Sequence, residues 1–460
     1  MKKIIIPILS LVILLSGCNE TRKSDFSGKP GEIKLITLNP GHFHAYLVQK
    51  SMYEQIDPTV HVYAPEGSEV ENHLMMIESY NTREENPTTW NTVVFSGDDY
   101  IERMLAEKKG NVVMLAGNNR LKTEYIKKAA DHGLNVLSDK PMAIDEEGFN
   151  LLKEAFNTAA ENNVLIYDIM TSRHNITKII KAEIMNMPEV FGEIEKGSPE
   201  NPSITLENIH YFFKYVSGRI LRRPPWYFDV RQQGDGIVDV STHLVDFAQW
   251  SSFPEEIIDY SKDIKMISAS RWPTAITRSQ FESITGEPRF PAYLNEYIEN
   301  DTVLQVYANG YMLYRLKDIH VKISVNWHYR APEGVEDAHL SFARGSNANV
   351  IIRQGAEQNY KPVLYIEQVK PGDFFEAALI REFRNIQQKY PGVELKKLED
   401  SWKVVIPDVY LTGHEAEFTD VTKKYLQYLV DGEMPAWEVP NMIAKYYTTS
   451  QALEKARDAK

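Results

Sequence analysis

The amino-acid sequence predicts two domains: an α/β domain with a doubly wound parallel sheet, and an α+β domain with a large, mostly antiparallel open sheet. Between residues 32 and 168, short apolar strands alternate with helical segments, as in sheets built from crossover connections. Later segments alternate polar and apolar residues, which is typical of half-buried strands. A chain of 460 residues, 43% of them hydrophobic, is also too long for one compact domain.

The first domain, residues 32–168, begins with an apolar strand at 33–38. Further strands are expected at 60–63, 112–116, 135–138 and 164–168, with helices at 46–55, 99–108, 121–132 and 146–162. Parallel strands joined by helices on both faces predict a dinucleotide-binding Rossmann domain, in which ligands bind at the carboxyl ends of the strands.

The second domain, residues 169–460, is expected to form a sheet with helices on one face and the other face free. Its strands are predicted at 204–211, 263–268, 302–308, 320–327, 339–343, 348–353 and 363–368, and its helices at 374–389, 420–431 and 441–459. The last of these helices closes the chain.

The first eighteen residues have the layout of a secretory signal. Two lysines precede an apolar run at 4–15 that is too short to span a membrane. The run ends in Leu-Ser-Gly-Cys18, which resembles a bacterial lipoprotein signal with Cys18 as the acylated residue. Residues 19–31 are polar and predict a flexible tether. We therefore expect a lipid-anchored protein of the bacterial cell envelope, at the outer rather than the inner membrane because Asn19 is not a retention aspartate.

Composition excludes two other classes of site. Cys18 is the only cysteine, so the chain has no disulfide and no thiolate metal centre. The net charge of −13 comes without a basic stripe, so nucleic acid is not an expected partner.

The loop after the first strand is an irregular phosphate loop. It reads Asn39-Pro-Gly41-His42-Phe43-His44, with one glycine where a Gly-x-Gly-x-x-Gly would have three. That glycine lets the backbone approach a pyrophosphate, and a helix beginning near His44 would offer free amides. The second strand ends at Ala64 where an acid would hold the adenine ribose, so Glu66 or another group takes that role.

Alternate histidines on this loop also suggest a metal ion, shared with His61 or His73. No carboxylate lies at a suitable spacing in the sequence, so we predict hydrogen-bonding or substrate roles for His42 and His44 and no dedicated metal.

A second motif lies in the segment Gln233–Trp250, where glycines are expected to open a helix. A spacing of four places Asp239 and His243 on one face, with Asp246 and Trp250 continuing the stripe. A carboxylate one turn from an imidazole can orient it and raise its basicity, which suits a group that takes a proton from a hydroxyl. The alternative is a salt-bridged pair on the surface.

Lys140 follows the strand at 135–138 and precedes Pro141. Proline disfavours the α region for the residue before it, so Lys140 should be extended at the carboxyl end of the sheet. The alternative is an ordinary solvated lysine after a strand.

These two motifs resemble those of the glucose-fructose oxidoreductase, inositol dehydrogenase and rhizopine-catabolism (Gfo/Idh/MocA) family. That family carries a Glu-Lys-Pro motif, here Asp139-Lys140-Pro141, and a Gly-Gly-x-x-x-Asp-x-x-x-His helix. The resemblance covers residues 32–260 by motif and implies that Lys140, Asp239 and His243 are catalytic.

The resemblance also implies an NAD cofactor, with NADP as the alternative. Ala116-Gly-Asn118-Asn119 is similar to the family's Thr-Pro-Asn loop, which lies against the cofactor. The cofactor contacts it implies are Asn39, Gly41, His42, Phe43, Glu66, Ala116, Asn118, Asp139 and Lys140.

Four further residues are candidates for substrate binding beside the catalytic trio. Arg173 and His174 lie where the family has a basic residue near the substrate, but they could equally cap the helix after Asn175 and neutralise Asp168. Arg223 and Trp226 precede the Asp239 segment, where arginine and aromatic side chains suit sugars; the alternative is a domain-packing loop.

The resulting expectation is a membrane-tethered NAD(P)-dependent oxidoreductase that acts on a secondary hydroxyl, or the corresponding ketone, of a sugar or glycoside. Because export removes the protein from free nicotinamide, the cofactor should be tightly bound and recycled, as in interconversion of a glycoside and its 3-keto form. The alternatives are an NAD-dependent glycosidase and a non-catalytic saccharide-binding lipoprotein. The free face of the second sheet is expected to support a homo-oligomer.

Overall fold

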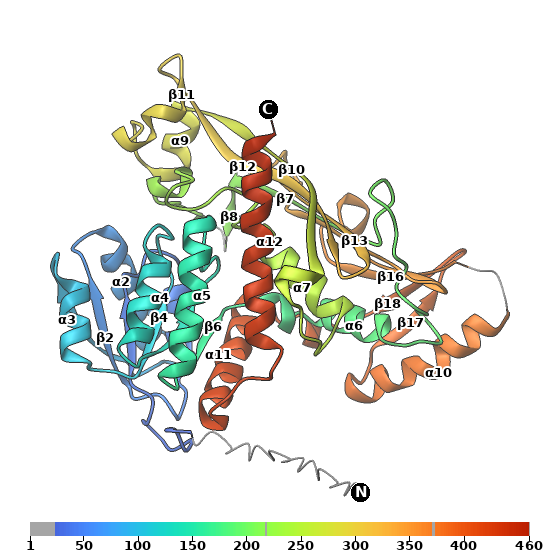
Figure 1. Cartoon of the computed structure of the whole chain (residues 1–460), viewed down its shortest axis with the longest axis horizontal. Coiled ribbons are helices and arrows are strands. Elements are labelled where there is room, and N and C mark those ends of the chain that lie inside the picture. The colour runs from blue at the N-terminus through green and yellow to red at the C-terminus, as the bar shows by residue number, and fades with distance from the viewer. Residues whose placement is uncertain (1–23, 217–218, 370–372, 460) are drawn as a thin grey trace, which may run out of the picture.

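The structure is a computed structural model that describes residues 24–216, 219–369 and 373–459. It contains one parallel sheet and one larger mixed sheet, with the long helix α12 (Glu438–Asp458) running between them (Figure 1). The predicted signal peptide, Cys18 and the first part of the tether lie outside the described residues. Within the described ranges, no helix has the length and apolar character needed to cross a membrane.

The first domain has the predicted doubly wound sheet. Six parallel strands lie in the order β3-β2-β1-β4-β5-β6. They are β1 (Leu35–Leu38), β2 (Thr59–Ala64), β3 (Asn91–Ser96), β4 (Val112–Leu115), β5 (Asn135–Ser138) and β6 (Ile166–Asp168). The helices α2 (Ser68–Thr82), α3 (Tyr100–Glu107), α4 (Lys122–Asp131) and α5 (Glu146–Glu161) connect them. This order reverses between β1 and β4, which is where a dinucleotide binds in such sheets.

The predicted helix at 46–55 is wrong. A single turn, α1 (His44–Leu47), is followed by a 3₁₀ turn, η1 (Val48–Lys50), and the chain is extended at Ser51. The indole of Trp90 donates to the Gln49 carbonyl at 2.6 Å and Arg83 donates to the Lys50 carbonyl at 2.8 Å. These carbonyls therefore bond the segment before β3 and not a further turn of helix.

The second domain is built on the predicted, mostly antiparallel sheet. Its strands lie in the order β10-β12-β13-β7-β14-β15-β16-β18-β17, and only β13 and β7 pair in parallel. They are β7 (Ile204–Phe213), β10 (Ile264–Thr277), β12 (Val303–Leu316), β13 (Ile319–Arg330), β14 (Ala338–Arg344), β15 (Ala348–Gln354), β16 (Val363–Gln368), β17 (Glu394–Lys397) and β18 (Trp402–Val405). Short strands are β8 (Tyr215–Val216), β9 (Arg219–Ile220) and β11 (Ile298–Glu299).

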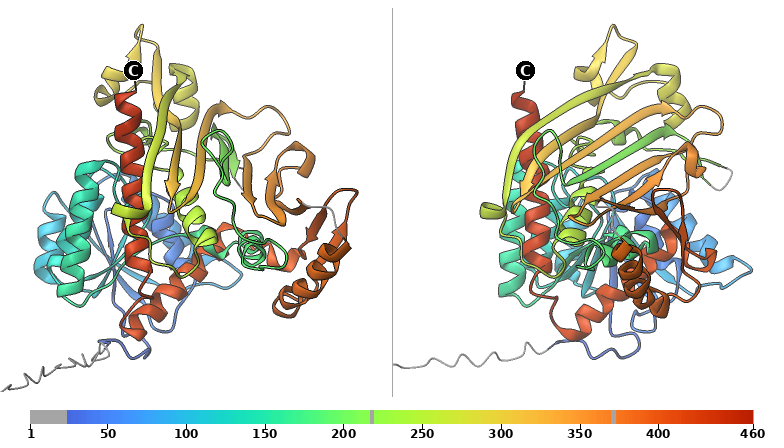
Figure 2. Two further views of the ribbon diagram at one scale, coloured as in Figure 1. Left: turned by 45° about the vertical axis from the view of Figure 1, so that its right-hand side comes forward. Right: turned by 90° about the vertical axis from the view of Figure 1, so that its right-hand side faces the viewer.

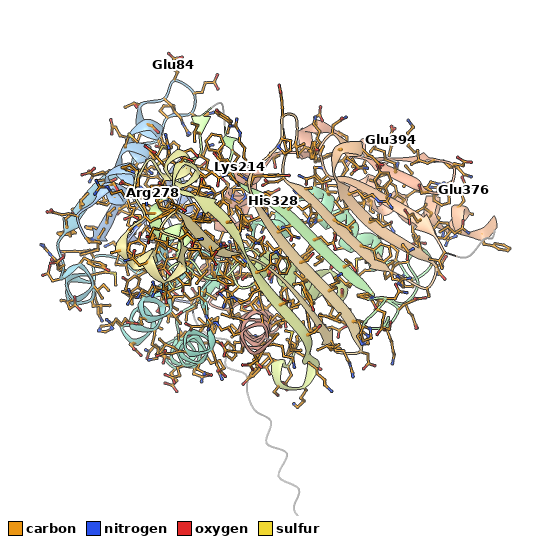
Figure 3. The ribbon with its side chains drawn as sticks, turned by 90° about the horizontal axis from the view of Figure 1, so that it is seen from above. Glu84, Lys214, Arg278, His328, Glu376 and Glu394 are labelled. Atoms are coloured by element: carbon orange, nitrogen blue, oxygen red, sulfur yellow. The ribbon has the colours of Figure 1, made fainter. Side chains whose placement is uncertain are left out.

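Helices cover the inner face of this sheet (Figure 2), and the strands are open to view on the outer face (Figure 3). α6 (Ile176–Met185), α7 (Ser241–Ser252) and α12 pack below the strands. The remaining helices are α8 (Tyr260–Asp263), α9 (Arg278–Thr285), α10 (Asp373–Lys389) and α11 (His414–Asp431), with 3₁₀ turns η2 (Thr171–His174), η3 (Pro225–Phe228), η4 (Ala292–Tyr297), η5 (Ala356–Gln358) and η6 (Asp408–Tyr410). The layering follows from the strands, whose inner residues are apolar and buried.

The two C-terminal helices also complete the core of the first domain. α11 and the first part of α12 contribute Phe418, Tyr425, Leu429, Met442 and Tyr446 to the same hydrophobic cluster as β1, β4 and β5. The second half of α12 packs in the other core through Ala452 and Leu453. The two domains therefore share a helix as a common wall.

A buried network of charges fixes this wall in place. Lys445 of α12 is fully buried and lies 2.5 Å from Asp168 of β6 and 2.9 Å from Asp246 of α7. Arg173 of η2 forms two hydrogen bonds with Asp246, at 2.8 and 2.7 Å, and also pairs with Glu438 of α12 at 2.8 Å. Two cations and three carboxylates thus join the last strand of one domain to two helices of the other.

We expect Lys445→Met to destabilise the protein by about 3–5 kcal/mol, because it leaves Asp168 buried without its cation and removes one of the two cations that pair with Asp246. Thermal and urea unfolding of the purified protein would measure the loss. Lys455→Met, at an exposed position of the same helix, is the control and should have little effect. Equal stability of the two variants would contradict this role for Lys445.

Candidate active site

The catalytic candidates converge where the carboxyl edge of the parallel sheet meets the inner face of the second domain. Lys140 follows β5, and its ammonium group donates to the carboxylate of Asp239. Gln233 donates to the other oxygen of Asp239 at 2.9 Å. Burial opposes a charge on Lys140, but Asp239 and then Asp139 raise its pKa, so the group stays protonated and can donate a hydrogen bond.

The helix begins later than predicted, so it carries His243, Asp246 and Trp250 of the predicted stripe but not Asp239. α7 begins at Ser241, and Asp239 lies in the turns before it. The cause is Gly236, whose amide donates to the Tyr307 carbonyl and which packs so closely that a Cβ would lie 1.7 Å from the Ala308 carbonyl oxygen. Strand β12 thus holds the glycine segment, and the carboxylate of Asp239 binds Lys140 and Gln233.

His243 lies in the first turn of α7, and its Nδ1 is buried without a hydrogen-bond partner. Burial, together with the charges of Lys140 and Lys178, holds the pKa of His243 well below its usual range. The imidazole is therefore neutral at neutral pH, and its unpaired Nδ1 has no partner within the described residues.

On the other side of Lys140, Asp139 lies between two histidines of the loop after β1. Its carboxylate oxygens are 3.1 Å from Nδ1 of His42 and 2.9 Å from Nδ1 of His44. Burial alone would raise the pKa of the Asp139 carboxyl, but His44 and His42 hold it well below its usual range. Burial also lowers the pKa of His44 to about 4. The two histidines meet Asp139, and neither His61 nor His73 belongs to this group.

The loops after β1 and β4 pack directly on each other. The amides of Gly41 and His42 donate to the Ala116 carbonyl at 3.0 and 3.2 Å, and a Cβ on Gly117 would lie 2.5 Å from the Asn39 carbonyl oxygen. The side-chain amide of Asn118 donates to the side-chain oxygen of Gln232 at 2.7 Å, which ties this loop to the segment before α7.

A cavity of about 370 Å³ opens beside these loops, between β1, the start of α2 and the loop at 221–227. Its wall includes Gly41, His42 and Phe43, and Gly41 has room, since a Cβ there would meet nothing closer than 3.5 Å. His73 lines the cavity with both ring nitrogens buried and unpaired. A backbone wall at the strand ends and an unsatisfied polar group fit the ADP part of a dinucleotide, so we call this space the dinucleotide cavity.

Glu66, the acid expected near the end of β2 to hold the adenine ribose, is exposed and does not line this cavity. Glu69 and Asn72 of α2 line the cavity in its place, and Glu69 accepts from the indole of Trp226. Sequence reasoning missed Glu69 and Asn72, and it considered His73 only as a metal ligand, because α2 was not predicted.

The other substrate candidates occupy different places. Arg173 is held by Asp246 and Glu438, and Lys445 takes the predicted role of neutralising Asp168. Asn175 itself caps α6, and His174 lines a separate cavity near Trp437. Arg223 donates to the Phe212 carbonyl and lies over the ring of Tyr227, while Trp226 lies over Gly41 in the dinucleotide cavity.

A polar group that sequence reasoning missed lies on the inner face of the second sheet. Strand β7 places Ile204 and Leu206 on this face and then Asn208 and His210, which interrupt the apolar series. With Asp337, His339 of β14 and Lys178 of α6, they line a cavity of about 250 Å³. The polar residues in the apolar series of β7 could have been recognised in the sequence. The packing of β14 and α6 beside them could not.

Two protein-family models together match most of the chain. Residues 44–168 match "Oxidoreductase family, NAD-binding Rossmann fold", and residues 180–457 match "Putative oxidoreductase C terminal domain". A comparison with curated proteins gives no match.

Solved structures of the same architecture include a close relative. The "putative oxidoreductase" from Parabacteroides merdae is 52% identical, with a TM-score of 0.93, over 95% of this chain and 100% of that one. A levoglucosan dehydrogenase in complex with NADH and levoglucosan is 12% identical, with a TM-score of 0.58 over 93% and 98% of the two chains. A 3-ketoreductase from Actinomadura kijaniata is 13% identical, with a TM-score of 0.54 over 93% and 97%. The last two share the fold.

The fold and these matches define an NAD(P)-dependent oxidoreductase with an NAD-binding Rossmann domain. The chain belongs to the Gfo/Idh/MocA family, as the motifs around Lys140 and His243 predicted.

Burial of His73 predicts a pH dependence of stability. Burial lowers its pKa from 6.5 to about 4, so between these pH values the unfolded chain binds a proton that the folded protein does not. The contribution of neutral His73 to the free energy of unfolding is fully present above pH 6.5 and is lost as the pH falls toward 4. It amounts to roughly 3 kcal/mol.

We expect His73→Leu to flatten the fall in unfolding free energy between pH 6.5 and pH 4. Urea unfolding at several pH values would measure it, with His320→Leu, at the start of β13, as the control. An unchanged pH profile in His73→Leu would show that His73 is not held neutral.

Proposed function

We propose that the protein oxidises a secondary hydroxyl of a sugar or glycoside, or reduces the corresponding ketone, in the cleft between its two domains. The observation that carries this proposal is the polar cavity on the inner face of the second sheet. Four buried atoms around it have no hydrogen-bond partner: Thr177 Oγ1, His210 Nε2, Asp337 Oδ1 and His339 Nε2. Unpaired buried polar atoms are costly, and a ligand with several hydroxyl groups would satisfy them.

Charged groups of this cavity act on the catalytic candidates. The charge of Lys178, which lines the cavity, acts on His243. The hydroxyl of Tyr227 is close enough to Lys140, Asp239 and Asp337 for each of their charges to act on it. A sugar in the cavity could therefore present a hydroxyl to Lys140 and His243.

A second cavity continues from the first along the end of the sheet. It measures about 750 Å³ and shares Asp337 and Gln354 with the smaller cavity. Its wall includes the rings of Tyr211, Phe213 and Tyr215, with Lys214 at the end of β7 (Figure 3). Aromatic faces beside charged groups suit the apolar faces and hydroxyls of a sugar, so this space accommodates the rest of a glycoside.

Asp337 is the group best placed to bind hydroxyls. It accepts from His210 at 3.0 Å and from Lys214 at 2.7 Å, and it keeps one oxygen unpaired. Burial alone would raise its pKa, but these partners lower it to about 2, so it is a carboxylate that accepts from a donor.

In the proposed reaction, neutral His243 accepts the proton of the reacting hydroxyl, and protonated Lys140 donates a hydrogen bond to the same oxygen. Asp239 positions Lys140, which replaces the predicted role of orienting His243. The nicotinamide, when bound, takes the hydride. The residues that would hold the dinucleotide are those of the Gly41 loop, Ala116, Asn118 and the wall formed by α2.

We also propose the predicted lipid anchor at Cys18 and an envelope location, which make a captive and recycled cofactor necessary.

One observation favours the alternative of a non-catalytic saccharide-binding lipoprotein. The Gly41 and His42 amides, which a phosphate loop would offer to a pyrophosphate, already donate to the Ala116 carbonyl.

We expect Lys140→Ala to lower kcat for a glycoside or 3-keto glycoside at least about 100-fold, because the reacting oxygen loses its donor. Stopped-flow absorbance of the reduced nicotinamide would measure the step, and Lys423→Ala, on the exposed face of α11, is the control. Mass spectrometry of nucleotide released from the purified protein separates the alternatives: recovery of NAD or NADP supports the enzyme, whereas no nucleotide and no binding favour the saccharide-binding protein.

We expect Asp337→Asn to raise KM about 10-fold or more while kcat changes less, because a charged acceptor for substrate hydroxyls is lost away from the reacting atom. Steady-state kinetics on the same substrates would test this. Asp318→Asn, at an exposed turn of the same sheet, is the control. A loss confined to kcat would contradict a substrate-binding role for this cavity.

A further inference from the structure

Three potential metal ligands converge at the carboxyl edge of the parallel sheet, two from the loop after β1 and one from the segment after β5. Nδ1 of His42, Nδ1 of His44 and the carboxylate of Asp139 offer donor atoms that all lie within 4.8 Å of one another. Asp139 and His44 are 3% and 4% exposed, so their donor atoms are shielded from bulk water. Two histidines and a carboxylate, with further positions open, are a common ligand set of catalytic zinc and of other first-row metals.

The distances suit donors that share one ion. Bonds of about 2.0–2.2 Å to zinc place neighbouring donors roughly 3 Å apart. The nitrogens of His42 and His44 lie 3.1 and 2.9 Å from separate oxygens of Asp139. A small inward adjustment of one ring would thus put both nitrogens and the carboxylate around a single ion.

A residue of α11 fixes the orientation of one of these ligands. Nε2 of His44 lies 2.7 Å from Nε2 of His414, the first residue of α11. The two imidazoles hydrogen-bond to each other, which fixes the orientation of the His44 ring. Metal-ligating histidines are held in this way by a hydrogen bond to the nitrogen that does not bind the ion.

We propose that His42, His44 and Asp139 bind a divalent transition-metal ion of the Zn²⁺ class. The carboxylate supplies one negative charge and the two imidazoles none, while the adjacent ammonium of Lys140 is already neutralised by Asp239. The three ligands carry one negative charge, so a bound dication would leave one positive charge. An anionic ligand from the solvent or from a bound molecule would neutralise it.

The open side of the site faces the dinucleotide cavity. The side chain of His42 is 28% exposed and lines that cavity together with Gly41 and Phe43. Water, or an oxygen atom of a molecule in the cavity, would complete the coordination. This site gives a role to the two histidines at the point where the loop departs from a glycine-rich phosphate loop.

Titration of the untagged, chelator-treated protein with Co²⁺ tests the proposal without nucleotide or substrate. Visible absorption bands of Co²⁺ report coordination by nitrogen and oxygen, and displacement by Zn²⁺ gives the zinc affinity. We expect one equivalent per chain in the wild type. His44→Ala and, at the more exposed position, His42→Ala should each lose this binding, and His414→Ala should weaken it about 10- to 100-fold through its hold on His44.

His73→Ala is the matched control, because it removes another buried histidine of the same cavity that is outside the site, and it should bind as the wild type does. Circular dichroism would identify any variant that fails to fold, and His42→Ala then decides. Absence of a stoichiometric Co²⁺ or Zn²⁺ site in the wild type, or unchanged affinity in folded His42→Ala, would overturn the proposal and leave a hydrogen-bonded His-Asp-His network. Because no catalytic readout is used, either outcome is independent of the proposed oxidoreductase reaction.

Discussion

The buried contact of Lys445 with Asp168 and Asp246 is the constraint on which the geometry of the cleft depends. Asp168 ends the parallel sheet, and Asp246 lies one turn beyond His243 on α7. Paired buried charges add little net stability over an apolar core, but they tolerate few alternative arrangements because each group needs its partner. The network therefore acts mainly on position. It holds the helix that carries His243 against the strand system that carries Lys140, although these segments lie about a hundred residues apart.

Much of the fold was readable from the sequence because its strands obey a simple period. Side chains, most of them apolar, are buried along the whole of β1, β4 and β5. In β13 apolar side chains are buried at every second residue, as the alternating sequence predicts. α2 and β3 were missed for the opposite reason. α2 is rich in Glu, Asn and Ser with few buried residues, and β3 is an edge strand with an exposed pattern, so neither carries a strong hydrophobic signal.

The site was predictable in its members and less so in its contacts. Lys140 and Asp239 were identified by motif, but their direct pairing was not, because a four-residue spacing carries geometric meaning only inside a helix and Gly236 delays the helix until Ser241. Contacts such as His44 with His414 and His210 with Asp337 join residues far apart in the chain. Their formation depends on tertiary packing, for which a single sequence has no local pattern.

The contribution of α11 and α12 to the first core has a consequence for how the chain acquires its structure. Tyr425, Met442 and Tyr446 belong to the same hydrophobic cluster as strands that are synthesised some three hundred residues earlier. Until those helices emerge, this hydrophobic cluster is incomplete, and contacts of such long sequence separation form slowly. The N-terminal and C-terminal ends must therefore fold together, and a truncation before α11 would leave the core of the nucleotide-binding half incomplete.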